Sequence, residues 1–220
     1  MCWICDSSPL SSSEKTGRHG SALGQFSGQN RNTFDISLCC IPYSRACPCC
    51  MCTCACFVPV VVYMRHRALN HDRPGSGWSN YICCQGYYGG CCCFQPGQCC
   101  EKTCPCPCMC FESICCPGLA VSATSMIIRE KHNLGLDSDD IRLIRCSNCL
   151  QILSCLCTII ACLTPNDRDD QFAYIFDLFA DCVFCSVASC STAQTYHEII
   201  IQERRANSRG SAPSRQRMNR

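Results

Sequence analysis

Cysteine is the residue type whose number and spacing in this chain most clearly indicate a chemical role. The sequence holds 31 cysteines among 220 residues, and 13 of them fall between Cys83 and Cys116. An ordinary hydrophobic core does not need so many thiols. The pattern therefore indicates thiol chemistry, and the three kinds to weigh are metal ligation, disulfide bonding and acylation.

The densest cluster favours metal ligation. Its cysteines alternate with proline, which fixes φ and removes a backbone donor, so we expect an extended or turned backbone there and no helix. Closely spaced thiolates on such a backbone can surround a soft ion such as zinc, cuprous copper or cadmium. The ligands predicted in this cluster are Cys99, Cys100, Cys104, Cys106, Cys108, Cys110, Cys115 and Cys116.

A second zinc site is predicted in the carboxy-terminal half. Cys146 and Cys149 form one CxxC, and Cys182 and Cys185 form another. A spacing of three places each pair on one face of a helix. If the two helices fold back near residue 167, the pairs come within about a turn and a half of each other. Four thiolates can then bind zinc tetrahedrally; the alternative is that they are buried, reduced cysteines acting as small apolar residues.

The cellular compartment decides between reduced thiols and disulfides. The first twenty residues lack the basic leader, apolar run and cleavage site of a signal peptide. We therefore expect reduced thiols at the cytoplasmic face of a membrane. The odd number of cysteines also excludes complete internal pairing. Two alternatives stay open, namely a multiply palmitoylated membrane scaffold that binds a protein partner, and an extracellular disulfide-rich protein.

Sequence motifs for catalysis are missing. The chain has no GxSxG, P-loop or dinucleotide fingerprint, and none of its five histidines belongs to an HExxH. We predict that the protein is not an enzyme. The net charge is +2, and six arginines without any acid lie between Arg204 and Arg220. Without aromatic platforms beside it, this basic tail predicts no nucleic-acid partner.

Helices that would carry the later cysteines are readable after residue 118. We expect a mainly α fold with an irregular cysteine-rich middle, a C-terminal helical hairpin or small helical bundle, and disordered termini. Helices are expected over residues 119–131, over residues 141–163 and from residue 171 to about residue 200. In the third helix an apolar stripe recurs at steps of three and four, formed by Phe172, Ile175, Phe176, Phe179 and Val183.

Composition divides the chain into four regions. Residues 1–33 are rich in Ser, Gly, Asn and Gln and are predicted to be a disordered leader. Residues 34–118 form the cysteine-rich region and residues 119–205 a helical domain. Residues 206–220 are predicted to be a disordered basic tail.

Two uncharged stretches have about the length that a bilayer crossing needs. Residues 46–64 are interrupted by prolines, and residues 146–166 contain several polar side chains. Asp177 and Asp181 stand where the following helix would need apolar residues in order to cross. We therefore expect peripheral or shallow membrane association rather than two firm crossings.

Two blocks of the sequence resemble the placenta-specific-eight family, which includes onzin and the plant cadmium-resistance and cell-number-regulator proteins. One block is Cys99-Cys100…Cys104-Pro-Cys-Pro-Cys108, which leads through Cys115-Cys116-Pro117 into an apolar segment. The other is Asp177-Leu-Phe-Ala-Asp-Cys-Val-Phe-Cys185…Cys190…Gln194-Thr-Tyr-His-Glu198. The resemblance covers about half of the chain. It implies a membrane-associated protein with roles in divalent-metal handling or control of cell size, and it implies no catalytic residues.

The residues and the resemblance lead to one functional prediction. We predict a cysteine-rich, membrane-associated protein that binds or handles zinc or another soft metal ion through thiolate clusters. Its predicted partners are the membrane and metal ions, with a protein partner or a second copy of the chain as further candidates.

Overall fold

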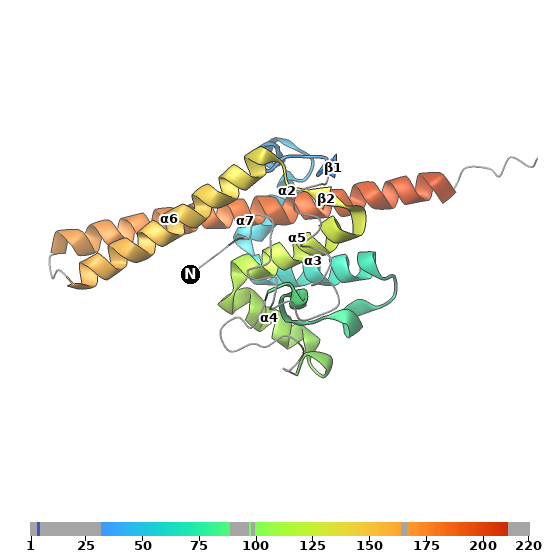
Figure 1. The fold of residues 1–220 in the computed structure, drawn as a ribbon, viewed down its shortest axis with the longest axis horizontal. Helices are drawn as coiled ribbons and strands as arrows, with labels where there is room; N and C mark the ends of the chain where they lie inside the picture. Colours follow the sequence, from blue (N-terminus) through green and yellow to red (C-terminus); the bar gives the residue numbers. More distant parts are fainter. Residues whose placement is uncertain (1–3, 5–31, 89–96, 98–99, 164–166, 211–220) are drawn as a thin grey trace, which may run out of the picture.

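Helices make up almost all of the described chain (Figure 1), which confirms the mainly α fold class. The structure is a computed structural model, and it describes residue 4, residues 32–88, residue 97, residues 100–163 and residues 167–210. The elements in chain order are β1 (Asn32–Thr33), η1 (Leu38–Tyr43), α2 (Cys47–Ala55), α3 (Phe57–Asp72), η2 (Gly77–Asn80), η3 (Cys83–Gly86), η4 (Cys100–Lys102), α4 (Pro105–Cys115), α5 (Pro117–His132), β2 (Leu134–Gly135), α6 (Ser138–Leu163) and α7 (Asp167–Gly210).

The two Cys-Pro-Cys segments are helical, so the expectation of an irregular, non-helical middle is wrong. They form the first turns of α2 and α4, and both helices carry proline at one of their first two positions. Proline is tolerated there because the first four N–H groups of a helix have no intrahelical partner. Pro117 occupies the same kind of position at the start of α5. In this region proline therefore marks where helices begin, and it does not exclude them.

The carboxy-terminal hairpin is confirmed, because α6 and α7 run back along each other (Figure 1). The acids at the start of α6 have two different roles. Asp137 Oδ1 accepts a hydrogen bond from the N–H of Ser138, the first residue of α6, at 2.8 Å. Asp140 is buried, and its carboxylate holds the base of the hairpin against η1. Its Oδ1 accepts from Ser37 Oγ and the Leu38 N–H, both at 2.8 Å.

The hydrophobic core lies where α3 and α5 pack beside α7 (Figure 1). Met64 of α3, Met126 of α5 and Ile199 of α7 are all buried in one cluster. Tyr87 and Met109, from the predicted cysteine-rich region, belong to the same cluster. The core therefore draws its side chains from both sides of the boundary at residue 118.

Two contacts attach the amino-terminal part of the chain to this body. Ile4 is buried, and its backbone exchanges two hydrogen bonds with the side chain of Asn148 on α6, at 3.0 and 2.7 Å. β1 pairs in parallel with β2, with Asn32 opposite Leu134. The closed end of the hairpin, where α6 ends and α7 begins, extends away from the rest of the molecule, at the left of Figure 1.

Candidate functional site

Most of the predicted metal ligands are exposed and dispersed. Cys99 lies outside the described residues. Among the other eleven, Cys116 is buried, and Cys108 and Cys110 are half-buried. The exposed ones are Cys100, Cys104, Cys106, Cys115, Cys146, Cys149, Cys182 and Cys185. In the described part of the chain, none of these residues belongs to a group of three or more His, Cys, Asp or Glu ligand atoms within 4.8 Å of one another.

The two CxxC pairs of the hairpin lie away from its interior. Hydrogen bonds from Gln151 to Asp181, at 3.0 Å, and from Ser154 to Asp177, at 2.5 Å, show which positions of α6 and α7 face each other. The side chains buried on α6 include Ser147, next to the exposed Cys146. The cysteine pairs therefore share a level along the hairpin, but the structure does not bring their four thiols together.

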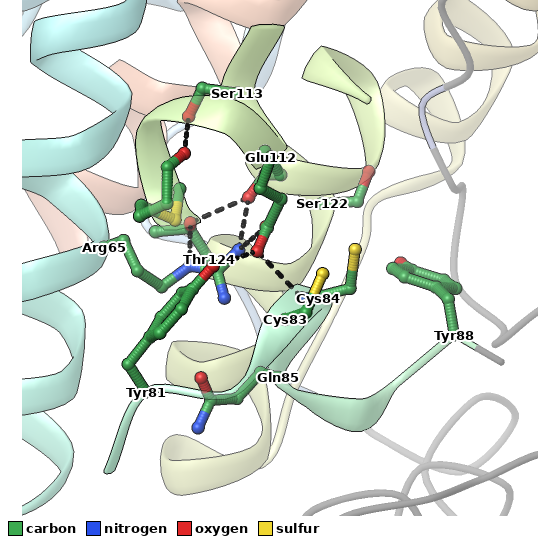
Figure 2. A network of polar contacts seen from close by, with 12 residues as sticks. Arg65, Tyr81, Cys83, Cys84, Gln85, Tyr88, Glu112, Ser113, Ser122 and Thr124 are labelled. Carbon is green, nitrogen blue, oxygen red and sulfur yellow. Dashed lines mark hydrogen bonds and ion pairs between the residues drawn. The ribbon is translucent and has the colours of Figure 1, made fainter. Parts of the chain in front are cut away.

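A different group does come together in the described structure, formed by Cys83, Cys84 and Glu112. All three residues are buried, and their ligand atoms lie within 4.8 Å of one another. Figure 2 shows the two thiols beside the Glu112 carboxylate. The backbone turns sharply here, because Cys84 and Gln85 have φ values of 46° and 53°, in the left-handed region that few non-glycine residues adopt. This turn brings both thiols and the Cys84 N–H to α4.

Arg65 completes the group (Figure 2). Its Nη2 donates to Glu112 Oε1 at 2.7 Å and to the Ala120 carbonyl at 3.0 Å, and its Nε donates to Thr124 Oγ1 at 2.9 Å. The other carboxylate oxygen, Glu112 Oε2, accepts from the Tyr81 hydroxyl at 2.8 Å and the Cys84 N–H at 2.9 Å. Both oxygens of Glu112 are therefore occupied by donors, one from α3 and two from the stretch 81–84.

Electrostatics hold these groups in fixed protonation states. Burial alone lowers the pKa of Arg65, but the Glu112 carboxylate and its other neighbours outweigh burial and raise it. The hydrogen bond with Cys83, burial and the charge of Glu112 raise the pKa of Cys84 well above its usual value. Burial and Glu112 likewise raise the pKa of Tyr81. Arg65 is therefore a cation, and Cys84 and Tyr81 keep their protons at neutral pH.

These protonation states favour a structural role for the group over metal binding. A metal ion would have to displace the donors on Glu112, remove the proton from Cys84 and tolerate the charge of Arg65 nearby. The group as it stands joins α3, α4 and the turn at η3 through one buried ion pair. We interpret it as a clamp that positions the cysteine-rich segments.

Sequence reasoning missed Arg65 and Glu112, although one signal was present. Glu112 is the single charged residue between Lys102 and Arg129. A lone charge in so long an uncharged stretch indicates a buried group that needs a partner. The identity of the partner, 47 positions earlier in the chain, follows no spacing rule.

The hairpin buries polar side chains of α6 and exposes large apolar ones, which is the opposite of the arrangement in a water-soluble helical hairpin. Gln151 and Ser154 of α6 are buried and bond to α7, and Ser147 is buried as well. The buried residues on the α7 side are apolar, namely Ala173, Ala180 and Phe184. The outer surface of the hairpin is apolar. The exposed large side chains there are Ile152, Leu153, Leu156, Ile159, Ile160, Leu163, Phe172, Tyr174, Ile175, Leu178 and Phe179.

Both helices of the hairpin are long and apolar enough to cross a membrane. The two candidate segments are Ser138–Leu163, of 26 residues, and Asp170–Ser208, of 39 residues. The core helix of a soluble protein also passes such a test, but it is mostly buried. Here only 28% and 33% of the most apolar windows are buried inside the protein. The low burial favours a lipid environment over a protein core.

No protein-family model matches the chain, and no curated protein or solved structure matches it either. The resemblance to the placenta-specific-eight family therefore stays a prediction. The class that the fold itself defines is a cysteine-rich, mainly α protein with two candidate membrane helices.

Proposed function

We propose that this protein is membrane-associated and that the projecting part of its α6–α7 hairpin inserts into the bilayer. The inserting segment comprises residues 149–163 and 170–183. The observation that carries the proposal is the outer surface of the hairpin, with eleven large apolar side chains exposed while polar side chains of α6 are buried. The proposal assigns the protein no catalytic activity and no nucleic-acid partner.

Transfer of the exposed apolar side chains of the hairpin from water into lipid is energetically favourable. Full burial of one large apolar side chain is worth about 1.5–3 kcal/mol. Eleven such side chains, each covered in part, provide on the order of 10 kcal/mol. In lipid the buried polar side chains of α6 become an advantage, because hydrogen bonds between helices have no water to compete with them.

The two acids on α7 are compatible with this environment. Asp177 and Asp181 were expected to oppose membrane crossing, because a charge in the hydrocarbon core is costly. Both carboxylates instead accept hydrogen bonds from α6, from Ser154 and Gln151. Acids in membrane helices typically face the bundle interior and find a partner there.

The length of the projecting segment favours deep insertion over the shallow association expected from sequence. Residues 149–163 of α6 span about 22 Å at 1.5 Å per residue. The hydrocarbon core of a bilayer is about 30 Å thick. The segment therefore reaches through most of the core, and the exposed Arg168 and Asp170 at its tip approach the far interface.

Vesicle flotation tests the proposal. The full chain is synthesised cell-free with phosphatidylcholine vesicles, washed with carbonate and floated on a density gradient. The test variant replaces Leu156, Ile160, Ile175 and Phe179 with Gln, which removes exposed apolar surface and favours helix. The control replaces the exposed Tyr43, Met51, Phe111 and Ile114 of the body with Gln.

We expect the wild type and the control variant to float and the hairpin variant to remain at the bottom of the gradient. Equal flotation of the hairpin variant would overturn the proposal. Association between copies through the same surface is the other outcome, in which the wild type elutes as a lipid-free oligomer and does not float.

Thiolate metal binding is proposed as a second function, and the cysteines of α4 favour it. Cys106 and Cys110 lie one turn apart, and their sulfur atoms are close together. Burial, followed by the charge of Cys106 and a hydrogen bond with it, raises the pKa of Cys110, so a metal ion would have to displace the Cys110 proton. Cys106 is exposed and so is Cys104 beside it. Such a surface can offer a soft ion two or more thiolates.

Elemental mass spectrometry on protein purified anaerobically under reduction tests this second function. We expect bound zinc or another soft metal in the wild type and a loss of metal in Cys106→Ser/Cys110→Ser. Exposed cysteines of the hairpin, such as Cys146 and Cys149, are instead candidates for acylation, which hydroxylamine treatment reverses. A metal-free protein whose membrane attachment is hydroxylamine-sensitive would replace metal binding with acylation.

A further inference from the structure

Two histidines meet where the ends of α3 and α5 converge. His71 lies in the last turn of α3 and His132 is the last residue of α5. Their Nε2 atoms are 2.8 Å apart, and the ring centroids are 5.1 Å apart. Helix carboxyl ends carry partial negative charge and favour cations. The convergence of two such ends offsets part of the repulsion that a positive ion at this position meets from Lys131.

Both rings are neutral near pH 7. Burial, followed by the charge of Lys131, lowers the pKa of His71. Burial, followed by His71 and Lys131, lowers the pKa of His132 to about 4. A neutral imidazole keeps a lone pair on one nitrogen, which is the form that binds metal. Lys131 donates to the carbonyl oxygens of His71 and Asp72, and its ammonium is therefore directed at the backbone.

The separation of the two nitrogens is close to what one shared ion requires. Zinc–nitrogen bonds are about 2.0–2.1 Å long and the coordination is tetrahedral. Two imidazole nitrogens on one such ion therefore lie about 3.3 Å apart. In the structure the two Nε2 atoms point almost directly at each other, so both rings have to turn for their lone pairs to meet at one ion beside the contact.

Glu203 of α7 lies on the far side of the His71 ring. Its Oε1 is 3.8 Å from His71 Nδ1, and its Oε2 accepts from Arg67 Nη2 at 3.2 Å. Metal-binding histidines typically direct the second ring nitrogen at a carboxylate, which fixes the tautomer and the ring orientation. A proton on Nδ1 facing Glu203 places the lone pair of His71 on Nε2, towards His132.

Solvent can reach the pair from two sides. One surface hollow is lined by residues that include His66, His71 and Glu203. A second is lined by residues that include His132, Glu198 and Asp35. An ion between the histidines could therefore complete its coordination with water from either hollow.

We propose that His71 and His132 bind one divalent transition-metal ion of the zinc class through their Nε2 atoms, with Glu203 as the positioning residue behind His71. The site uses no thiolate and no residue of the projecting part of the hairpin that is proposed to insert, because Glu203 lies near the other end of α7. It is therefore independent of both membrane insertion and thiolate metal binding.

Residue-resolved chemical modification tests the site without interference from zinc bound to cysteine. The full chain is treated with diethyl pyrocarbonate at neutral pH over a zinc titration, and each histidine peptide is quantified by mass spectrometry. We expect zinc to protect His71 and His132 with one common midpoint. His197, which lines neither hollow, provides the internal control, and its modification stays independent of zinc.

Three variants complete the test. His71→Ala raises the zinc midpoint at His132 about tenfold or more, and Glu203→Gln raises the common midpoint about tenfold, as loss of an outer-shell carboxylate typically does. His197→Ala leaves the midpoint unchanged, because His197 lines neither hollow. If millimolar zinc leaves the wild-type histidines fully reactive, the contact is only an N–H···N hydrogen bond and the proposal is wrong. It is also wrong if His132 stays equally protected in a folded His71→Ala variant.

Discussion

Arg65 and Glu112 form an ion pair of 2.7 Å with both side chains removed from water, at 0% and 1% exposure. The pair connects α3 to α4, and Tyr81 and Cys84 complete the hydrogen bonds of the carboxylate. A buried charge that loses its partner is costly, because neither water nor another ion can replace the lost interaction. The stability of the cysteine-rich half therefore depends on this contact.

Replacement of Glu112 by Gln tests that dependence. Glu112→Gln keeps the size of the side chain but leaves Arg65 as an unpaired buried cation. We expect the free energy of unfolding to fall by about 3–5 kcal/mol. A urea titration in mild detergent, followed by circular dichroism, measures the change.

A double variant separates the ion pair from packing. Arg65→Met/Glu112→Leu removes both charges together, so we expect it to recover much of the lost stability. If the free energy of unfolding of Glu112→Gln lies within about 1 kcal/mol of the wild-type value, the Arg65–Glu112 clamp contributes little to stability.

Asp140 provides a second test, at the base of the hairpin. Its Oδ2 accepts from Gln194 Nε2 at 2.8 Å, in addition to the bonds from η1. Asp140→Ala leaves these buried donors unpaired, and we expect a loss of about 1–3 kcal/mol in the free energy of unfolding. The matched control is Asp139→Ala, because Asp139 is exposed and its contact among the described residues is a surface ion pair with Arg142. Equal stability of the two variants would contradict the assigned role of Asp140.

The reactivity of Cys49 tests the electrostatics of α2. Burial, and then the neighbouring Cys52, raise the pKa of Cys49 to about 11. Only the thiolate reacts with iodoacetamide, so at pH 8 about one molecule in a thousand is reactive at Cys49. We expect its alkylation rate to rise about tenfold for each pH unit up to pH 10. Peptide mass spectrometry gives the rate at each cysteine, and a rate at Cys49 that is independent of pH would refute the raised pKa.

The helical hairpin could be predicted from sequence. Whether the apolar face of its second helix packs against α6 or is exposed could not. The steps of three and four between Phe172, Ile175 and Phe179 correctly indicated a helix. Periodicity does not say whether an apolar face meets protein or another environment. In the structure these three side chains are exposed, and Asp177 on the other face bonds to α6.

Proline explains why the cysteine-rich middle was predicted less well. The sequence predicts that Pro105 excludes helix and that Pro48 interrupts an uncharged stretch, whereas each lies in the first turn of a helix, where its missing N–H costs nothing. Proline can begin a helix when it lies in the first turn, and it breaks a helix when it lies in the interior. The sequence alone does not show which of the two positions a given proline occupies. The Arg65–Glu112 and His71–His132 contacts depend on how α3, α4 and α5 pack, which no local pattern contains.

The most direct test of membrane insertion uses cysteines that the chain already has. Cys162 lies near the hairpin tip and is exposed, as are Cys39 and Cys115 in the body. The vesicle-bound protein is labelled with a membrane-impermeant maleimide, with and without detergent, and each cysteine is quantified by mass spectrometry. Insertion predicts that Cys162 is protected until detergent is added, while Cys39 and Cys115 are labelled throughout. If Cys162 is labelled as fast as Cys39 on intact vesicles, the hairpin is not in the bilayer.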